Sequence, residues 1–417
     1  MKQQILHTPE GVRDIYNKEC SKKLSLQRRL HNVLHLYGYR DIQTPTFEFF
    51  DVFREEVGTI GSKELYKFFD REGNILSLRP DITPSIARAA ATISEQEPIQ
   101  MRLCYIGNTF INHTSYQGRP KEHTQMGAEV IGDDSVEGDA EMLALVVESL
   151  QTADLQTFQV NVGNAAFFQC LIEDAGLEKN DELRLRELIN NRNYFSADDF
   201  LKELDVREST IKAFAALPEL VGGVEVLAKA KKAAPNKKAV RAVERLEAVY
   251  EMLDFYGVQK YITFDLSMSG NYGYYTGIIF RGYTYGTGDA VVKGGRYDHL
   301  LEKFGNASPS IGFVILVDEL MNALGRQKIH IPYPNSNTLV LYDEGRQREA
   351  VSLAKEFRNN RKNTEILKRE NNITIEDYAE YGERNFAGSM VYLQVNGVIR
   401  LYNLKTGEEK LISQGQR

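Results

Sequence analysis

The segment Leu78-Arg79-Pro80-Asp81-Ile82-Thr83-Pro84 marks the clearest boundary between an extended stretch and a helix in this sequence. Threonine can cap a helix, and proline fits the first helical turn because its missing N–H needs no partner there. The pair Thr83-Pro84 therefore predicts a helix over residues 85–93. From residue 76 to about residue 150, strands and helices are expected to alternate.

On the N-terminal side of this segment, apolar residues recur at helical spacing over residues 19–36. The members of this stripe are Leu24, Leu30, Val33 and Leu34, and the expected helix ends at Tyr37-Gly38-Tyr39. An extended stretch follows over residues 41–47 and carries Pro45. Because proline cannot donate to a strand ladder, this stretch is expected at a sheet edge or at an interface.

On the C-terminal side, residues 166–257 have the composition of polar helices, with a break at Gly222-Gly223. Strands are expected again at residues 261–266, 277–285 and 290–293, with helices at residues 297–304 and 318–324. The pattern indicates a sheet that is interrupted by a helical insertion and then completed.

A linker at residues 331–337 contains Pro332 and Pro334, and it separates a second unit over residues 338–417. This unit begins with an expected strand at 338–342 and a helix at 347–358. Two β-rich runs between residues 391 and 401 flank Asn396-Gly397, which predicts a hairpin with a type I′ turn. The second unit is therefore expected to be a small α/β domain.

Composition limits the classes of function that are open to the chain. Its 417 residues are 42% hydrophobic, which is enough for two or three globular domains. No apolar run approaches the roughly 20 residues that span a bilayer, and the N-terminus lacks a signal-peptide core, so a cytoplasmic protein without membrane contact is expected. The formal net charge is 51 − 58 = −7, so nucleic-acid binding would need a local basic patch.

One basic run offers such a patch, although a solvated helix face is the alternative interpretation. The run spans residues 229–245 and comprises Lys229, Lys231, Lys232, Lys237, Lys238, Arg241 and Arg245.

Metal and cofactor sites are not expected from local spacing. The cysteines Cys20, Cys104 and Cys170 are far apart and form no CxxC pair. His31 and His35 lie one helical turn apart, but no third ligand adjoins them in sequence, so a helix-surface interpretation is favoured. The sequence also lacks a phosphate-binding P-loop and a dinucleotide-binding glycine motif between strand and helix.

Several segments, taken in order, resemble the histidyl-tRNA synthetases, a family of class II aminoacyl-tRNA synthetases. The segment 78–84 resembles their LRPEGT element, and Gly273-Tyr274-Tyr275-Thr276-Gly277 resembles their LDYYTG element. The further similarities are to the N-terminal signature at residues 8–14, the first motif at 39–45, the second at 104–110 with 125–129, and the third at 294–298 with Gly312-Phe313. They cover most of residues 1–325, and chance does not account for their shared order and spacing.

The resemblance implies an α+β fold built on a class II synthetase-like antiparallel sheet of six or seven strands, flanked by helices. It implies a synthetase-like domain over residues 1–325, a helical insertion at about 166–257, and a small C-terminal α/β domain at 338–417 in the place of the anticodon-binding domain. It also implies a homodimer that forms through the first motif, which agrees with the edge position expected for the stretch with Pro45.

The sequence departs from the family at the arginines that hold ATP phosphates. In the synthetases an arginine follows the phenylalanine of the second motif, whereas here Phe110 is followed by Ile111-Asn112-His113. The other two arginine positions hold Gly270 and Glu319. Loss of one such donor costs about 2.7–4 kcal/mol in activation free energy, so adenylation is expected to be negligible and no catalytic residue is assigned.

The amino-acid pocket is expected to persist. Four polar residues fall where the synthetases hold the amino group and imidazole of histidine, and two tyrosines fall where aromatic walls enclose them: Asp81, Thr83, Gln125, Glu129, Tyr275 and Tyr297. Arg119 is a candidate anion contact. Asp81 and Gly273 replace a glutamate and an aspartate of the family, so the pocket is expected to differ in its contacts.

A purely structural interpretation of these residues stays open. Thr83 would then only cap a helix, the tyrosines would only pack, and Glu129 would pair with Arg119 or Arg79.

A synthetase-like chain that keeps amino-acid recognition without adenylation resembles the regulatory subunits of the short-form, two-component ATP phosphoribosyltransferases. That resemblance implies a non-catalytic partner of a separate catalytic chain, acting in the first step of histidine biosynthesis. Histidine would be the effector, and regulatory homodimers would assemble into a hetero-octamer.

Two other functions remain open, a divergent active histidyl-tRNA synthetase and a synthetase-like module that senses tRNA. The missing arginines argue against the first. Against the second stand the net charge and the acidic run Glu376, Asp377, Glu380 and Glu383 in the C-terminal unit. Binding of tRNA is therefore not expected.

Overall fold

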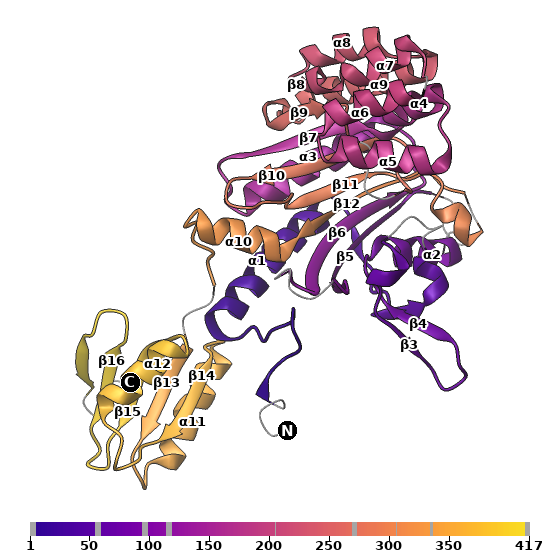
Figure 1. Cartoon of the computed structure of the whole chain (residues 1–417). Coiled ribbons are helices and arrows are strands. Elements are labelled where there is room, and N and C mark those ends of the chain that lie inside the picture. Colours follow the sequence, from indigo (N-terminus) through magenta and orange to yellow (C-terminus); the bar gives the residue numbers. More distant parts are fainter. Residues whose placement is uncertain are drawn as a thin grey trace. The chain divides into compact units, whose positions relative to one another are not determined.

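The computed structural model describes residues 6–54, 60–93, 99–113, 119–204, 206–268, 273–305, 307–333 and 337–412 (Figure 1). The chain divides into two compact units, Met1–Asp14 with Leu26–His330, and Ile15–Ser25 with Ile331–Arg417. Among the described helices, none combines the length and apolar character needed to cross a bilayer.

The first unit is built on a sheet flanked by helices, which confirms the expected α+β fold class. The sheet has nine strands in the described residues, where six or seven were expected, and it is mixed where an antiparallel sheet was expected. Two neighbour pairs are parallel, β1 with β5 and β7 with β9, and the other six are antiparallel. The strand order is β1 (Arg40–Asp41), β5 (Met101–Phe110), β6 (Glu122–Ile131), β12 (Ser310–Leu316), β11 (Val292–Arg296), β10 (Ile278–Thr284), β7 (Phe158–Asn164), β9 (Ile262–Asp265) and β8 (Val221–Gly222).

Helix α1 (Asn17–Leu36) confirms the helix expected at residues 19–36. It buries Leu26, Leu30, Val33 and Leu34, which recur at the spacing of one helical face. Leu24, expected in the same stripe, is exposed. Helix α2 (Thr83–Ile93) begins at Thr83, where the sequence placed the helix boundary.

The stretch with Pro45 does not form one continuous strand. β1 lies at the edge of the large sheet, whereas β2 (Phe47–Phe49) belongs to a separate sheet of order β2, β4 (Ile75–Leu78), β3 (Lys67–Phe69). Pro45 falls between the two strands, where its missing N–H removes no ladder hydrogen bond. The chain therefore leaves the large sheet after β1 and enters the small sheet at β2, with Pro45 in the connection between them.

Six helices and strand β8 fill the interval in which a helical insertion was expected, and they lie together in Figure 1. Asparagine side chains start two of them: Asn164 accepts from the amide of Ala166, and Asn236 accepts from the amide of Ala239. The helices are α4 (Ala165–Ala175), α5 (Lys179–Asn190), α6 (Tyr194–Glu203), α7 (Glu208–Ala215), α8 (Glu225–Ala233) and α9 (Lys237–Phe255).

The second unit contains a five-stranded sheet with two main helices, α11 (Gln347–Asn359) and α12 (Ile375–Arg384). Its strand order is β14 (Thr364–Lys368), β13 (Asn337–Tyr342), β15 (Ala387–Leu393), β16 (Ile399–Asn403) and β17 (Glu409–Ile412). α12 starts with a capping box formed by Thr374 and Asp377, so this member of the acidic run has a structural role.

The hairpin expected around Asn396-Gly397 joins β15 to β16, but its turn is not type I′. Type I′ requires positive φ at both central residues, and here only Gly397 has it, with φ 85°. The carbonyl of Gln394 accepts from the amide of Gly397, which places Val395 and Asn396 at the turn centre and Gly397 after it. This is a type I turn followed by a left-handed glycine.

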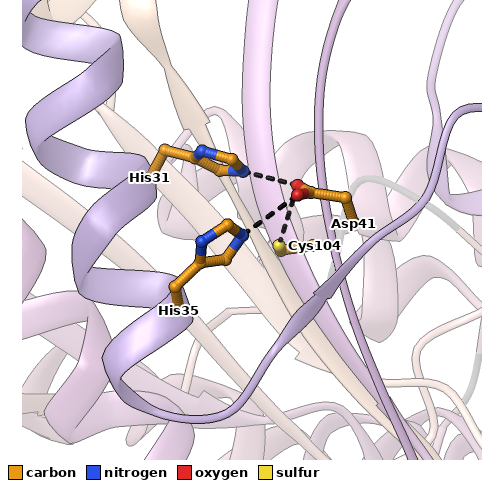
Figure 2. Close-up of side chains that lie close together, drawn as sticks. All are labelled: His31, His35, Asp41 and Cys104. Atoms are coloured by element: carbon orange, nitrogen blue, oxygen red, sulfur yellow. Dashed lines mark hydrogen bonds and ion pairs between the residues drawn. The ribbon is translucent and has the colours of Figure 1, made fainter.

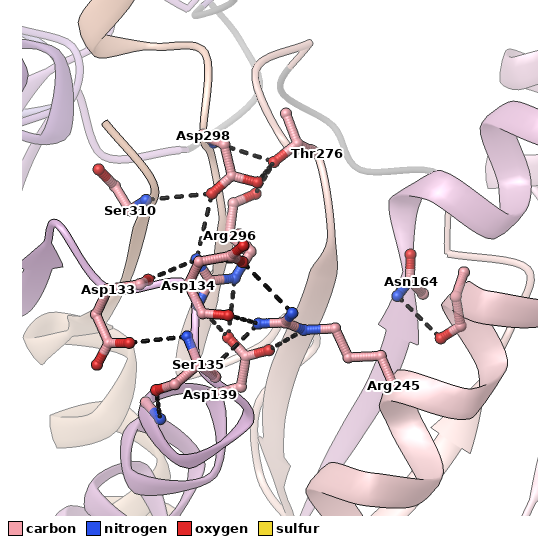
Figure 3. Close-up of polar contacts among 12 residues, drawn as sticks. Asp133, Asp134, Ser135, Asp139, Asn164, Arg245, Thr276, Arg296, Asp298 and Ser310 are labelled. Atoms are coloured by element: carbon pink, nitrogen blue, oxygen red, sulfur yellow. Dashed lines mark hydrogen bonds and ion pairs between the residues drawn. The ribbon is translucent and has the colours of Figure 1, made fainter. Parts of the chain in front are cut away.

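A buried ionic network fixes β11 against helix α3 (Val136–Thr152) (Figure 3). Arg296, at the end of β11, donates through Nη2 (2.6 Å) and Nε (3.0 Å) to Oδ1 of Asp139 on α3. Arg245 of α9 donates to the other oxygen of Asp139 at 2.7 Å. Asp139 is fully buried and Arg296 is 2% exposed, so neither charge has water as an alternative partner.

The same arginine reaches the segment that follows β11. Arg296 Nη1 donates to Asp298 Oδ1 at 3.2 Å, and Thr276 donates its hydroxyl to Asp298 Oδ2 at 2.7 Å. The network thereby holds the chain on both sides of Tyr297 and next to Tyr275.

Removal of Asp139 should destabilise the fold strongly because it would leave Arg296 buried and unpaired. We expect Asp139→Ala to lower the free energy of unfolding by about 3–5 kcal/mol, measured by urea denaturation. The matched control is Asp134→Ala, since the Asp134 side chain is 71% exposed beside the same two arginines. Its expected effect is within about 0.5 kcal/mol. Equal losses in the two variants would contradict this account.

Candidate functional site

One cavity of about 560 Å³ brings together every residue proposed for the amino-acid pocket. Its floor is formed by the central strands β6, β11 and β12, and its rim by the start of α2 and the segment before β10. The six expected residues Asp81, Thr83, Gln125, Glu129, Tyr275 and Tyr297 all line it, as do Arg119 and Glu319.

Glu129 is the most deeply buried carboxyl group of the cavity, with 1% of its surface exposed. Its Oε1 accepts from the Thr83 hydroxyl at 2.9 Å, and its Oε2 accepts from the Tyr297 hydroxyl at 2.5 Å. Burial raises the pKa of Glu129 to about 8, although these two hydrogen bonds oppose the shift. Among the described residues, no arginine pairs with Glu129, and Arg79 instead donates to the carbonyls of Asn108 and Thr44.

A glycine opposite Glu129 makes room for this carboxyl group. Gly312 of β12 is the cross-strand partner of Glu129 in β6. A Cβ atom at Gly312 would lie 1.5 Å from Glu129 Oε2 and 2.8 Å from the Ala128 carbonyl oxygen, so the carboxyl group could not keep its present position. Gly295 plays a similar part, because a Cβ there would lie 2.9 Å from the Tyr275 ring. The glycines of the third motif thus shape the cavity.

Asp81 lies at the entrance to α2 and combines a local role with exposure to the cavity. Its Oδ1 accepts from the amides of Ile82 (2.8 Å) and Thr83 (3.4 Å), and its Oδ2 accepts from the Tyr274 hydroxyl at 3.2 Å. Burial raises the pKa of Asp81 against these hydrogen bonds. Asp81 accepts from the amide of Thr83, the first residue of α2, whereas the Thr83 hydroxyl donates to Glu129.

Three tyrosines form the aromatic side of the cavity, and one of them was not selected from the sequence. Tyr274 lies 4.8 Å from Tyr275 and 5.8 Å from Tyr297, measured between ring centroids. The one feature of the sequence that pointed to Tyr274 as a cavity residue is its position next to Tyr275. Sequence alone does not decide which of two adjacent aromatic residues faces a cavity.

Gln125 contributes a polar atom that needs a partner. The residue is 8% exposed, and among the described residues its Oε1 has no hydrogen-bond partner. Buried side-chain oxygens are rarely left without a partner, so this oxygen is able to accept from water or from a bound molecule with a donor group.

Carboxyl groups outnumber lysine and arginine side chains on the cavity wall. The carboxyl-bearing residues that line it are Asp81, Glu129, Asp289 and Glu319. The lysine and arginine residues that line it are Arg119 and Lys293. Lys293 is itself paired with Asp289 at 3.0 Å. Ile111 and His113 line the cavity next to Phe110, and Gly270 lies outside the described residues. Arg296 is engaged with Asp139 and Asp298 and is not available to a ligand.

The basic run of residues 229–245 is partly neutralised within the chain. Lys231 pairs with Glu247 at 2.5 Å, Lys238 with Glu173 at 3.5 Å, and Arg245 with Asp139 at 2.7 Å. This pairing favours the solvated helix face over a nucleic-acid patch.

The arrangement suits a small cationic ligand with a flat ring. Two buried carboxyl groups with raised pKa values gain stabilisation as anions when a positive group arrives, and tyrosine faces attract cations and planar rings. A triphosphate has the opposite requirement, since it needs several fixed cations.

Comparison with known families gives a consistent assignment. The family model described as histidyl-tRNA synthetase matches residues 11–320. An ATP phosphoribosyltransferase regulatory subunit from Acetivibrio thermocellus is 36% identical over 97% of this chain and 96% of its own length. A protein of the same name from Caldanaerobacter subterraneus subsp. tengcongensis is 37% identical over 90% of this chain and 98% of its own length.

Solved structures agree with these relatives. An ATP phosphoribosyltransferase regulatory subunit/histidyl-tRNA synthetase from Bacillus halodurans matches with a TM-score of 0.81 and 28% identity, over 94% of this chain and 97% of that one. Histidyl-tRNA synthetase from Nostoc sp. PCC 7120 shares the fold, with a TM-score of 0.79 at 18% identity over 98% of this chain and 97% of that one.

The raised pKa of Glu129 predicts a specific pH dependence of stability. Between about pH 4.5 and 8 the folded chain keeps a proton that the unfolded chain has lost, so the free energy of unfolding falls as pH rises. Glu129→Gln removes this titration. Measured by urea denaturation, the variant's stability relative to the parent should therefore increase by up to about 1.4 kcal/mol per pH unit from pH 5 to 7.5.

The control for this measurement is Glu302→Gln, whose side chain is 65% exposed in the parent. Its stability should follow that of the parent in parallel across the same pH range. A Glu129→Gln curve that also ran parallel to the parent would contradict the buried, protonated state of Glu129.

Proposed function

Because this chain belongs to the family of ATP phosphoribosyltransferase regulatory subunits, which shares the histidyl-tRNA synthetase domain, we propose that it activates a separate catalytic chain and makes that chain sensitive to histidine. The catalytic partner is a short-form ATP phosphoribosyltransferase, and the reaction is the first step of histidine biosynthesis. The chain itself carries out no chemistry in this proposal.

The observation that carries the proposal is the cavity formed around Glu129. In a histidine complex, the ligand ammonium group would lie against the carboxylates of Glu129 and Asp81, which gain a counter-ion there. The imidazole would lie among the tyrosine rings, and Gln125 Oε1 would accept from one of its N–H groups or from the ammonium group. These residue types fit a free amino acid with a polar ring.

The proposed loss of adenylation is supported by the charge of the same cavity. A pentavalent phosphoryl transition state needs fixed cations, and Arg119 is the one described lining residue with a guanidinium group. Glu319 would repel the phosphates. The cavity therefore supports histidine binding without activation of the bound amino acid by ATP.

Feedback inhibition requires histidine to distinguish two states of the assembly. A ligand that bound the active and inhibited assemblies equally would shift no equilibrium. In the proposal, the tyrosines and the α2 entrance are arranged differently in the two states, and histidine favours the arrangement that holds the catalytic partner inactive.

The proposed assembly is a hetero-octamer that contains regulatory homodimers. Support for a dimer comes from the small sheet β2-β4-β3, which continues from the first-motif region. Five large apolar side chains of this sheet are more than a third exposed: Phe47, Phe49, Phe68, Phe69 and Ile75. Exposed apolar groups gathered on one small sheet are typical of protein interfaces.

Histidine binding should be coupled to proton release from Glu129. By isothermal titration calorimetry we expect histidine affinity to rise between pH 6 and pH 8, with heats that depend on the ionisation enthalpy of the buffer. Glu129→Gln should weaken binding about 10- to 100-fold at pH 8, because a charge-assisted contact is lost. Glu319→Gln, in the same cavity, is the control and should bind as the parent does. An unchanged Glu129→Gln affinity would exclude this pocket.

The regulatory role is tested by phosphoribosyl transfer by the short catalytic chain from the same organism. Addition of the parent chain should increase turnover, and histidine should reverse the increase. Glu129→Gln should still activate at low histidine but should shift inhibition to about 10- to 100-fold higher histidine concentration. No effect of the parent chain on a folded, assembled partner would contradict the proposal.

Two measurements separate this proposal from its alternatives. An active synthetase would catalyse histidine-dependent exchange of pyrophosphate into ATP, which is expected to be absent here. A tRNA-sensing module would bind uncharged tRNA with an affinity that falls steeply with salt.

A further inference from the structure

Two histidine side chains project from the last turns of α1 toward the edge of the large sheet (Figure 2). His31 and His35 are four residues apart, so they lie one above the other on the same helical face. Their ring centroids are 4.2 Å apart. The sequence showed this pair but no third donor beside it.

The fold supplies two further donors from other elements. β1 and β5 are parallel neighbours, and their register places Asp41 directly beside Cys104. Figure 2 shows both side chains facing the two imidazoles. Cys104 lies about 60 residues beyond Asp41 in the chain and 0% of its surface is exposed, so only the strand pairing reveals the cluster.

The four donor atoms lie close enough together to surround one metal ion after small side-chain movements. One donor atom from each residue lies within 4.8 Å of all the others. His31 Nε2 is 2.5 Å from Asp41 Oδ1, His35 Nε2 is 3.1 Å from Asp41 Oδ2, and Cys104 Sγ is 3.6 Å from Asp41 Oδ1. Tetrahedral zinc has bonds of about 2.0–2.3 Å, which separate its ligand atoms by roughly 3.3–3.8 Å. Rotations about the side-chain bonds that move the donor atoms by about 1 Å would therefore complete the site.

We propose that His31, His35, Asp41 and Cys104 form a binding site for one borderline-soft divalent transition-metal ion, with Zn²⁺ as the best match. Two imidazoles, a thiolate and a carboxylate are a donor set for zinc and chemically similar ions, whereas Mg²⁺ and Ca²⁺ require oxygen ligands. On binding, the ion replaces the His–Asp hydrogen bonds, and each imidazole binds it through Nε2 as the neutral tautomer that carries its proton on Nδ1. The Cys104 thiol releases its proton to solvent.

The position of the site indicates a structural role. Four protein ligands fill a tetrahedral coordination sphere and leave no place for substrate. The ion would join the C-terminal end of α1 to the β1–β5 edge across the short connection at residues 37–39. His35 and Asp41 have side chains that are 44% and 56% exposed, which gives a metal ion access from solvent, and Cys104 forms the floor.

The proposal is tested with the full chain, free of any affinity tag, stripped with EDTA and dialysed against metal-free buffer. We expect one equivalent of Zn²⁺ to bind in calorimetry, and Mg²⁺ not to bind. Co²⁺ should bind to the same site with the intense visible bands of tetrahedral coordination and with a sulfur-to-cobalt charge-transfer band. Zinc at 100 times its Kd should raise Tm by about 2 °C or more.

Two variants and two controls assign the ligands. Cys104→Ser should abolish the charge-transfer band, and His35→Asn, at a largely solvent-exposed position, should weaken zinc binding at least about 100-fold, since loss of an outer-shell partner alone costs 10- to 100-fold. His299→Asn, with a 74% exposed side chain, and Cys170→Ser, at the other buried cysteine, should bind as the parent does. If Cys104→Ser fails to fold, His35→Asn alone decides the outcome.

Two results would overturn the proposal. One is a stripped chain that takes up less than a tenth of an equivalent of zinc at about 0.1 mM free ion. The other is zinc or cobalt binding that persists unchanged in His35→Asn, which would place the ion elsewhere.

Discussion

The buried ion pair between Arg296 and Asp139 is the constraint on which the rest of the first unit depends. Both charged side chains are buried, so the protein must supply their hydrogen-bond partners. These hydrogen bonds form only when α3, α9 and β11 pack in their native positions. The pair in turn fixes Asp298 and Thr276, which flank the tyrosines of the cavity. An arginine of the synthetase-like third motif thus serves the architecture of the pocket, and its chemistry is not directed at a ligand.

A second constraint is the burial of Glu129. The tyrosines that the ion pair holds in place surround this carboxyl group, and burial favours its neutral form. Glu129 is buried against Thr83, Tyr297 and the backbone of Gly312, and a bound cation would reverse the cost of ionising it. A ligand ammonium group would stabilise the carboxylate form of Glu129 in place of the proton. The same carboxyl groups are unfavourable for a triphosphate, which needs fixed cations.

Much of this could be predicted from the sequence because the relevant signals are local. The helical stripe of α1 follows from periodicity, the Thr83-Pro84 helix start from capping chemistry, and the helical insertion from the composition of residues 166–257. Elsewhere the tertiary structure differs from what the local pattern predicted. The stretch around Pro45 is divided between two sheets. Asn396 has negative φ because the hairpin turns one residue earlier, with Gly397 in the left-handed position. Tyr274 was missed because side-chain direction next to a strand depends on packing.

The sequence by itself determined the order of the elements and the synthetase-like motifs, since these are carried by neighbours along the chain. The resemblance of those motifs to a known family then indicated which residue types gather around one pocket. Only the tertiary structure decided which partners those residues take. It placed Gly312 under Glu129, it assigned Arg296 to Asp139, and it brought Asp41 and Cys104 to His31 and His35. The physical reason is that strand register and helix packing join residues tens to hundreds of positions apart, and no local pattern encodes those distances.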